Sequence, residues 1–367
     1  MAIEFHPLPV AVRPQTHESV ALTFEVPEHL RSTFTHLPGQ HVVLRAMIGG
    51  EDVRRSYSIC TAPGGGRVTV GVKRIPGGVF STWATTELAD GDTIGVMAPI
   101  GEFHHRPAPG AAANYVFLAA GSGITPVLSM LSTILEREEH SRCTLVYGNR
   151  TVGSIMFLEE LEGLKDRYCD RFQLIHTLSR EGSGVPLFEG RIDDEKVRAL
   201  AATLIPTGSV DAWYLCGPLD MVETVTKTLA DLGVDPSTVR HELFFDQRIE
   251  SLPEVPASAE GLVPMTFTLD GRTSQVAVDP AGPTLLDYAR SVRPEVPFAC
   301  KGGMCASCRC RVTQGAAVMA KNYALTESEV ADGYVLSCQA HPAPGVTTLA
   351  LDYDMNLRGT GVRLSES

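Results

Sequence analysis

Cys300-Lys-Gly-Gly-Met-Cys305-Ala-Ser-Cys308 is the stretch of sequence that decides how the C-terminal part of this chain folds. Its three cysteines are spaced C-x4-C-x2-C, and a fourth, Cys338, follows after the stretch 309–337. This is the plant-type spacing of a [2Fe–2S] cluster, in which four thiolates hold two irons. The sequence therefore predicts that Cys300, Cys305, Cys308 and Cys338 are metal ligands and that the chain transfers single electrons.

Zinc is the alternative occupant of a four-cysteine site, although zinc sites usually combine two matched C-x2-C pairs. The other cysteines are scattered along the chain, which fits free thiols in a reducing cytoplasm better than a disulfide framework. They are Cys60, Cys143, Cys169, Cys216 and Cys310.

Composition excludes several classes of function. The 367 residues are 44% hydrophobic and 20% charged, as in globular proteins, and are enough for two or three domains. The net charge of -12 argues against a nucleic-acid partner, because phosphate backbones select basic surfaces. The sequence shows no signal peptide and no apolar run near the roughly 18 residues of a membrane span. We therefore expect a cytoplasmic protein with no membrane partner.

Changes in pattern along the chain predict three domains. Residues 1–107 hold short β-type runs between Gly, Pro and Asp turns, as in an antiparallel β-barrel. Residues 108–250 alternate strands with helices, which predicts a doubly wound parallel α/β sheet. A Pro/Ala/Ser linker at 251–261 leads to residues 262–354, where a hairpin, a helix and the cysteine loop suit a small α+β domain of the β-grasp type. We expect residues 355–367 to be a tail.

A flavin site is predicted in the first domain. In Arg55-Ser-Tyr-Ser58, the arginine can pair with a pyrophosphate, the Tyr57 ring can lie on a flat flavin, and the Ser58 hydroxyl can bond the N5 edge of that flavin. An ordinary strand of alternating polarity is the alternative. The stretch 77–83 favours the flavin, because it is a glycine turn leading into a helix N-terminus, where free N–H groups bind phosphate.

A nicotinamide site is predicted in the second domain. Gly121-Ser-Gly-Ile-Thr-Pro126 follows an apolar strand and opens a helix, so that a pyrophosphate can approach the backbone. Cys216 and Gly217 end the last strand at the edge where ligands of open α/β sheets lie. A small thiol there leaves room for a nicotinamide ring, although a free cysteine is more commonly a buried apolar residue.

Three residues after the third strand of this domain bear on the choice of coenzyme. Two arginines and a hydroxyl can hold the 2′-phosphate that distinguishes NADPH from NADH. Solvated loop arginines are the alternative. The residues are Ser179, Arg180 and Arg191.

Taken together, these motifs resemble the ferredoxin–NADP reductase superfamily with a plant-type ferredoxin domain fused at the C-terminus. The motifs occur in the family order over nearly the whole chain: R-x-Y-S, G-G-x-x-S, G-x-G-x-x-P, C-G-P and the four cysteines. The resemblance implies an FAD site made by Arg55, Tyr57, Ser58, Gly78 and Ser81. It implies a pyridine-nucleotide site made by Gly121, Gly123, Thr125, Pro126, Cys216 and Gly217, with Ser179, Arg180 and Arg191 on the 2′-phosphate of NADPH. Glu242 and Phe244 match a family E-x-F near the flavin, and Ser58, Cys216 and Glu242 are the expected catalytic residues.

Several stretches are further similar to the family of reductase subunits that serve phenylacetyl-CoA 1,2-epoxidases in phenylacetate catabolism, among them Leu178-Ser-Arg-Glu181 and 333–340. The resemblance implies a route from NADPH to FAD, to the [2Fe–2S] cluster, and on to a separate diiron oxygenase. The alternative is the reductase component of a ring-hydroxylating or steroid oxygenase, one that could use NADH.

Two other classes of protein explain the sequence less well. A self-contained oxygenase would need its own metal site, and the single E-x-x-H, from Glu102 to His105, lies beside a Pro/Gly loop where we read it as chance. A ferredoxin-like carrier or redox sensor would not need two nucleotide-binding segments.

Overall fold

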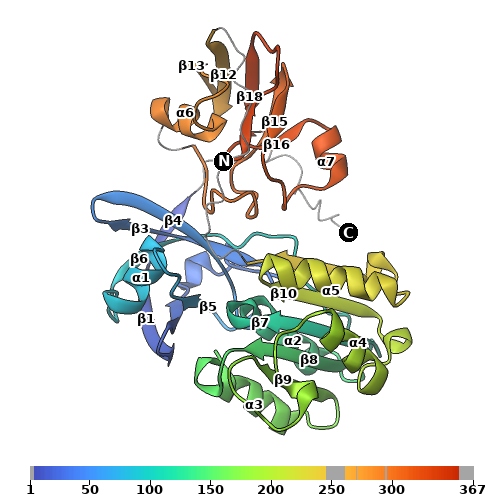
Figure 1. Ribbon diagram of the computed structural model, residues 1–367. Coiled ribbons are helices and arrows are strands. Elements are labelled where there is room, and N and C mark those ends of the chain that lie inside the picture. Colours follow the sequence, from blue (N-terminus) through green and yellow to red (C-terminus); the bar gives the residue numbers. More distant parts are fainter. Residues whose placement is uncertain (1–3, 245–260, 270, 294–295, 355–367) are drawn as a thin grey trace, which may run out of the picture. The chain divides into compact units, whose positions relative to one another are not determined.

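The computed structural model describes residues 4–244, 261–269, 271–293 and 296–354 (Figure 1). The chain divides into two compact units, one within residues 5–247 and the other largely within residues 248–367. The predicted tail at 355–367 and all of the predicted linker except Gly261 lie outside the described residues.

The first part of residues 5–247 is a six-stranded antiparallel sheet in the order β4-β3-β6-β1-β2-β5. Its edges meet, because Ile59 bridges Val70 and the Cys60 N–H donates to the Thr69 carbonyl oxygen at 2.8 Å. The sheet therefore closes into the predicted barrel around an apolar core, into which Phe80 also packs. The elements are β1 (Phe5–Thr16), β2 (Ser19–Glu25), β3 (His41–Ile48), β4 (Glu51–Ser58), β5 (Arg67–Lys73), α1 (Val79–Thr86) and β6 (Thr93–Met97).

The second part is a parallel five-stranded sheet in the order β11-β10-β7-β8-β9. One apolar cluster joins α2 and α3 to one face of this sheet, and another joins α4 and α5 to the other face, so the sheet is doubly wound as predicted. Figure 1 shows these helices with their strands. The elements are β7 (Asn114–Ala120), α2 (Ile124–Arg137), β8 (Arg142–Asn149), α3 (Leu158–Arg167), β9 (Phe172–Leu178), α4 (Asp194–Thr203), β10 (Ala212–Gly217), α5 (Leu219–Asp231) and β11 (Val239–Leu243).

A buried polar network holds in place the segment around His105, which connects the barrel to the α/β sheet. The two ring nitrogens of His105 lie 2.9 Å from the Tyr214 hydroxyl and 2.8 Å from Glu138 Oε1. Glu138 also accepts bonds from the Ala108 N–H and the Ser141 hydroxyl. Burial raises the pKa of Glu138, but these hydrogen bonds outweigh it and hold the pKa below its ordinary value. The connection is thus fixed by satisfied polar groups.

The C-terminal unit is a mixed sheet in the order β13-β12-β18-β14-β16, in which β12 and β18 are parallel, with a small second sheet of β15 and β17. Helix α6 packs Leu285, Leu286 and Ala289 into its core, as a β-grasp domain requires. The Thr284 side chain caps α6 by accepting a bond from the Asp287 N–H. The elements are β12 (Val263–Leu269), β13 (Arg272–Val278), α6 (Leu285–Val292), β14 (Arg309–Gln314), β15 (Ala317–Met319), α7 (Glu327–Ala331), β16 (Tyr334–Leu336), β17 (Ala340–Pro342) and β18 (Leu349–Asp352).

The predicted fold class of all three domains is confirmed. Strand β11 was not predicted, because Val239-Arg-His-Glu-Leu243 is polar at its centre and forms an edge of its sheet. Within the described residues, we find no helix with the length and apolar character needed to cross a membrane.

Candidate functional site

The two glycine-rich motifs of the α/β domain meet where β7 and β10 lie side by side. This is the point at which the strand order reverses, the usual ligand site of such sheets. Gly121 has a φ of +54°, which favours glycine. A β-carbon on Gly123 would lie 2.2 Å from the Cys216 carbonyl oxygen, so only glycine fits. The turn exposes the N-terminal N–H groups of α2 to a phosphate.

The first turn of α2 also contacts the barrel. Thr125 and Pro126 are buried, and the Thr125 hydroxyl donates to the Ser122 carbonyl oxygen at 3.1 Å. A β-carbon on Gly71 of β5 would come within 2.7 Å of Thr125 Cγ2. Gly71 therefore allows the start of α2 to pack closely against β5. The sequence did not predict this contact.

Ser58, Cys216 and Glu242, the three predicted catalytic residues, are brought together. The Ser58 hydroxyl at the end of β4 donates to Glu242 Oε2 at 3.0 Å, joining barrel to edge strand β11. Cys216 pairs with Glu242 in the register of β10 and β11. The Phe244 N–H donates to the Gly217 carbonyl oxygen at 2.9 Å, which extends the same edge.

Burial favours the uncharged forms of Glu242 and Cys216 at this meeting point. Burial raises the pKa of Glu242 to about 8, and the hydrogen bond from Ser58 lowers it only in part. Burial also raises the pKa of the Cys216 thiol, and the neighbouring Glu242 adds to that rise. An uncharged lining of this kind suits flat, uncharged rings.

The predicted flavin residues and their neighbour Arg54 differ in how much of each side chain remains free to contact a ligand. Arg54 is buried and paired with Asp52 at 2.7 Å, so it is structural. Arg55 is half-buried, and its one hydrogen bond with the described residues runs from Nη1 to the Arg54 carbonyl oxygen at 2.7 Å. Most of its five donors stay available for phosphate oxygens. Tyr57 is half-buried with its ring 5.5 Å from that of Phe80, and burial raises its pKa.

Gly78 and Ser81 form the turn that opens α1. The Ser81 hydroxyl accepts a bond from the Ile75 N–H at 3.1 Å and donates to the Gly78 carbonyl oxygen at 3.3 Å. A β-carbon on Gly78 would lie 2.5 Å from that hydroxyl. Ser81 therefore shapes the turn, and the free N–H groups at the start of α1 are the donors that fit a pyrophosphate. These donors, with Arg55 and Tyr57, are chemically suited to FAD.

The three residues predicted for a 2′-phosphate lie on the surface near the end of β9. The Gly190 N–H donates to the Leu178 carbonyl oxygen at 2.9 Å, which brings the segment before Arg191 alongside β9. Ser179, Arg180 and Arg191 are all exposed. Arg191 lies 3.9 Å from Asp220, and both side chains are at least 75% exposed, so a phosphate can compete for this arginine.

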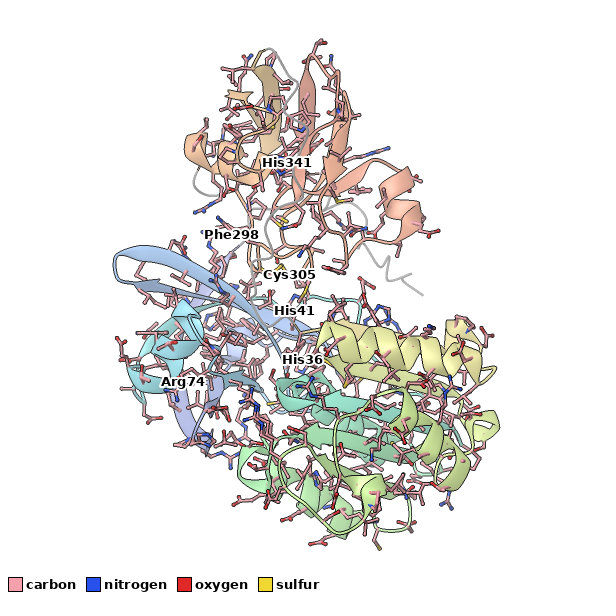
Figure 2. The ribbon with its side chains drawn as sticks, viewed as in Figure 1. His36, His41, Arg74, Phe298, Cys305 and His341 are labelled. Atoms are coloured by element: carbon pink, nitrogen blue, oxygen red, sulfur yellow. The ribbon has the colours of Figure 1, made fainter. Side chains whose placement is uncertain are left out.

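The four predicted cluster ligands lie in one loop and one strand end of the C-terminal unit, where Figure 2 labels Cys305. The loop bends through positive φ at Lys301 (+51°), Gly303 (+79°) and Ala306 (+51°). The Cys300 N–H donates to Cys305 Sγ at 3.4 Å, and Ser337, next to Cys338, donates its N–H and its hydroxyl to the Cys308 carbonyl oxygen at 3.1 and 2.9 Å, which brings the four cysteines together. No three His, Cys, Asp or Glu side chains among the described residues are placed to hold a single metal ion.

The spacing of these four cysteines is that of a plant-type [2Fe–2S] cluster, in which four thiolates hold two irons. Backbone N–H groups also point at the sulfurs: Gly302 N–H to Cys300 Sγ at 3.3 Å, Met304 N–H to the same sulfur at 3.5 Å, and Cys300 N–H to Cys305 Sγ at 3.4 Å. The site therefore fits a [2Fe–2S] cluster. Cys310 is fully buried behind it, beside Tyr353.

Comparisons with known proteins agree with these three sites. Residues 11–105 match the model of an oxidoreductase FAD-binding domain, 117–227 an oxidoreductase NAD-binding domain, and 267–343 a 2Fe-2S iron-sulfur cluster binding domain. The kinds of domain predicted, and their order, are confirmed.

Full-length relatives share the arrangement. The chain is 40% identical over 351 residues to a subunit of the 1,2-phenylacetyl-CoA epoxidase of Escherichia coli (strain K12), covering 95% of this chain and 98% of that protein. It is 32% identical to the ferredoxin reductase component of 3-ketosteroid-9-alpha-monooxygenase from Rhodococcus rhodochrous, covering 90% and 92%. The crystal structure of phthalate dioxygenase reductase superposes with a TM-score of 0.57 at 21% identity, covering 95% and 98%, and thus has the same fold.

The ligand set can be tested with a matched pair of cysteine variants. Cys338→Ala should abolish the electron paramagnetic resonance signal of the reduced cluster while FAD stays bound, because the flavin residues lie in the other compact unit. Cys310→Ala removes an equally buried thiol from the same core and should keep the signal. Loss of the signal in Cys310→Ala would contradict the ligand set, and loss of FAD in Cys338→Ala would indicate misfolding instead.

The pKa of Glu242 makes the stability of the flavin-binding unit depend on pH. Between about pH 4.5 and 8 the folded protein keeps a proton that the unfolded chain releases, so this group lowers the free energy of unfolding as pH rises. In Glu242→Gln that contribution is absent. Thermal unfolding, followed by the fluorescence of released FAD, should show that the unfolding temperature of the variant rises relative to that of the wild type between pH 6 and pH 8. Glu162→Gln, at an exposed position, should follow the wild type, and parallel curves for both variants would refute the assignment.

Proposed function

The chain belongs to the family of oxygenase reductase components that carry FAD and a [2Fe–2S] cluster, and from this we propose that it passes electrons from NADPH to the epoxidase of phenylacetyl-CoA. The reductase assignment depends on the juxtaposition of Ser58, Glu242 and Cys216 between the barrel and the α/β sheet. The proposed acceptor is supported by the 40% identity to the Escherichia coli 1,2-phenylacetyl-CoA epoxidase protein along nearly the whole of both chains.

FAD, when bound, accepts two electrons as a hydride and releases them singly, and the cluster carries them one at a time. The chain's own residues position these groups. In the proposed site, the nicotinamide lies against the Gly123 turn and the end of β10, which pack closely on each other, and Arg55 with the start of α1 binds the flavin pyrophosphate. Glu242, whose pKa is raised by burial, accepts the bond from the Ser58 hydroxyl and so holds that hydroxyl in place at the proposed flavin edge.

The proposed acceptor is a separate diiron oxygenase component, and no side chain of this chain needs to act on the organic substrate. The alternative acceptor is a steroid or ring-hydroxylating oxygenase, because the chain is also 32% identical to the reductase component of 3-ketosteroid-9-alpha-monooxygenase. The lower identity makes it the second candidate.

The proposed coenzyme is NADPH, and Arg180 provides the test. Arg180→Ala should raise the KM for NADPH by about tenfold to a hundredfold and leave the KM for NADH nearly unchanged, because one charge-assisted bond to the 2′-phosphate is lost. Arg198→Ala is the control, since Arg198 is a half-buried arginine of the same domain, with its side chain 42% exposed, that pairs with Asp194 and Asp231. A dye acceptor suffices for the assay. Equal effects on both coenzymes would reject the 2′-phosphate site.

The acceptor can be identified by reconstitution with purified oxygenase components, added one at a time. We expect the phenylacetyl-CoA-oxidising diiron component to turn over, with epoxide formed in step with the NADPH consumed. Turnover with a steroid or ring-hydroxylating oxygenase alone would reject the proposed pathway and leave the reductase assignment standing. Iron analysis of the responding component would test whether the acceptor is a diiron protein.

A further inference from the structure

Gln339 is a buried amide immediately after the cluster ligand Cys338, and it is only 9% exposed. Its Nε2 donates to the Lys301 carbonyl oxygen at 2.8 Å and to the Cys338 carbonyl oxygen at 2.9 Å. Because both partners are carbonyl oxygens, the NH2 group of the amide must be the end that faces them. This side chain therefore joins the two segments that supply the cluster ligands.

Lys301 is held in a conformation that side chains rarely adopt. Its φ of +51° lies in the left-handed region, which a lysine keeps only where its surroundings fix it. Its Nζ lies 2.9 Å from Asp287 Oδ1 and 5.4 Å from the centre of the Phe298 ring, the residue labelled in Figure 2 beside the loop. Its carbonyl group is held by Gln339, so Lys301 is fixed through both its side chain and its backbone.

The same peptide unit carries a donor to the cluster ligand. The Lys301 carbonyl and the Gly302 N–H belong to one planar trans peptide and point in opposite directions. The Gly302 N–H donates to Cys300 Sγ at 3.3 Å. A bond from Gln339 that holds the carbonyl on one side therefore holds the N–H toward the sulfur on the other.

We propose that Gln339 is a positioning residue that sets the reduction potential of the cluster through this peptide. Hydrogen bonds to the ligand sulfurs stabilise the reduced cluster, which carries the extra negative charge, and so raise its potential. Losing the Gln339 bond frees the peptide to rotate and weakens the bond from Gly302 to Cys300. The potential then falls. This inference rests on the cluster itself and not on which oxygenase receives the electrons.

The test compares two variants of the full-length, cluster-loaded protein. Gln339→Met keeps the length and approximate volume of the side chain and removes its donors. Its midpoint potential, measured by an EPR-monitored redox titration without any oxygenase, should shift to a more negative value. Resonance Raman spectra should show altered Fe–S(Cys) stretching.

Asn322→Ala is the matched control. Asn322 is another side-chain amide in the same unit, and it exchanges two hydrogen bonds with Leu325 instead of bonding the 300–305 loop. Its variant should keep the wild-type potential and Raman spectrum. Equal shifts in both variants would overturn the proposal, because they would reflect a general loosening of the domain.

A Gln339→Met protein that loses its cluster faster but has the wild-type potential would show a purely structural role and would also overturn the proposal. If Gln339→Met yields no cluster-loaded protein, Gln339→Asn replaces it. The shorter amide can bond the adjacent Cys338 carbonyl but falls short of Lys301, so the same negative shift is expected. An unchanged potential in Gln339→Asn would refute the role of the Lys301 peptide.

Discussion

The close approach of Gly123 to the Cys216 carbonyl is the constraint on which the nucleotide-binding unit depends. A β-carbon at position 123 would lie 2.2 Å from this oxygen, so the turn after β7 can approach the end of β10 this closely only if the position has no side chain. Gly71 does the same between the barrel strand β5 and Thr125 at the start of α2. Two glycines thus set how closely β5, β10 and the start of α2 meet, and the predicted flavin and nicotinamide residues lie around that meeting point.

Charge is distributed to suit a ligand with charged ends and neutral rings. Burial raises the pKa of both Glu242 and Cys216, which favours their uncharged forms at the centre of the site. Of the cations predicted to bind phosphate, Arg55 lies on β4, and Arg180 and Arg191 lie in the exposed region after β9. Phosphates bind through exposed, solvated charges, whereas hydride transfer between flat rings benefits from a dry and neutral environment.

Sequence patterns predicted the fold class of each domain, because it depends on local signals: the spacing of cysteines, glycine before a helix, and strand–helix alternation. What they missed depends on contacts between distant segments. The bond from Ser58 to Glu242 spans 184 positions, and the strand carrying Glu242 is too polar to be recognised alone. The position of Gln339 beside Cys338 was a usable signal, but nothing local indicates that its amide reaches Lys301.

Both compact units solve the same problem in the same way. Each builds its site from two segments far apart in the chain, and in each a side-chain hydrogen bond ties those segments together: Ser58 to Glu242 in one, and Gln339 to the Lys301 carbonyl in the other. In both cases the bond acts on the proposed cofactor indirectly. It positions the Ser58 hydroxyl near the flavin in one unit and the Lys301–Gly302 peptide near the cluster in the other. Such a bond contributes only about 1 kcal/mol to folding, so its more important effect is on geometry. Electron transfer depends on potentials that differ by small free energies, and a bond of this size is enough to set them.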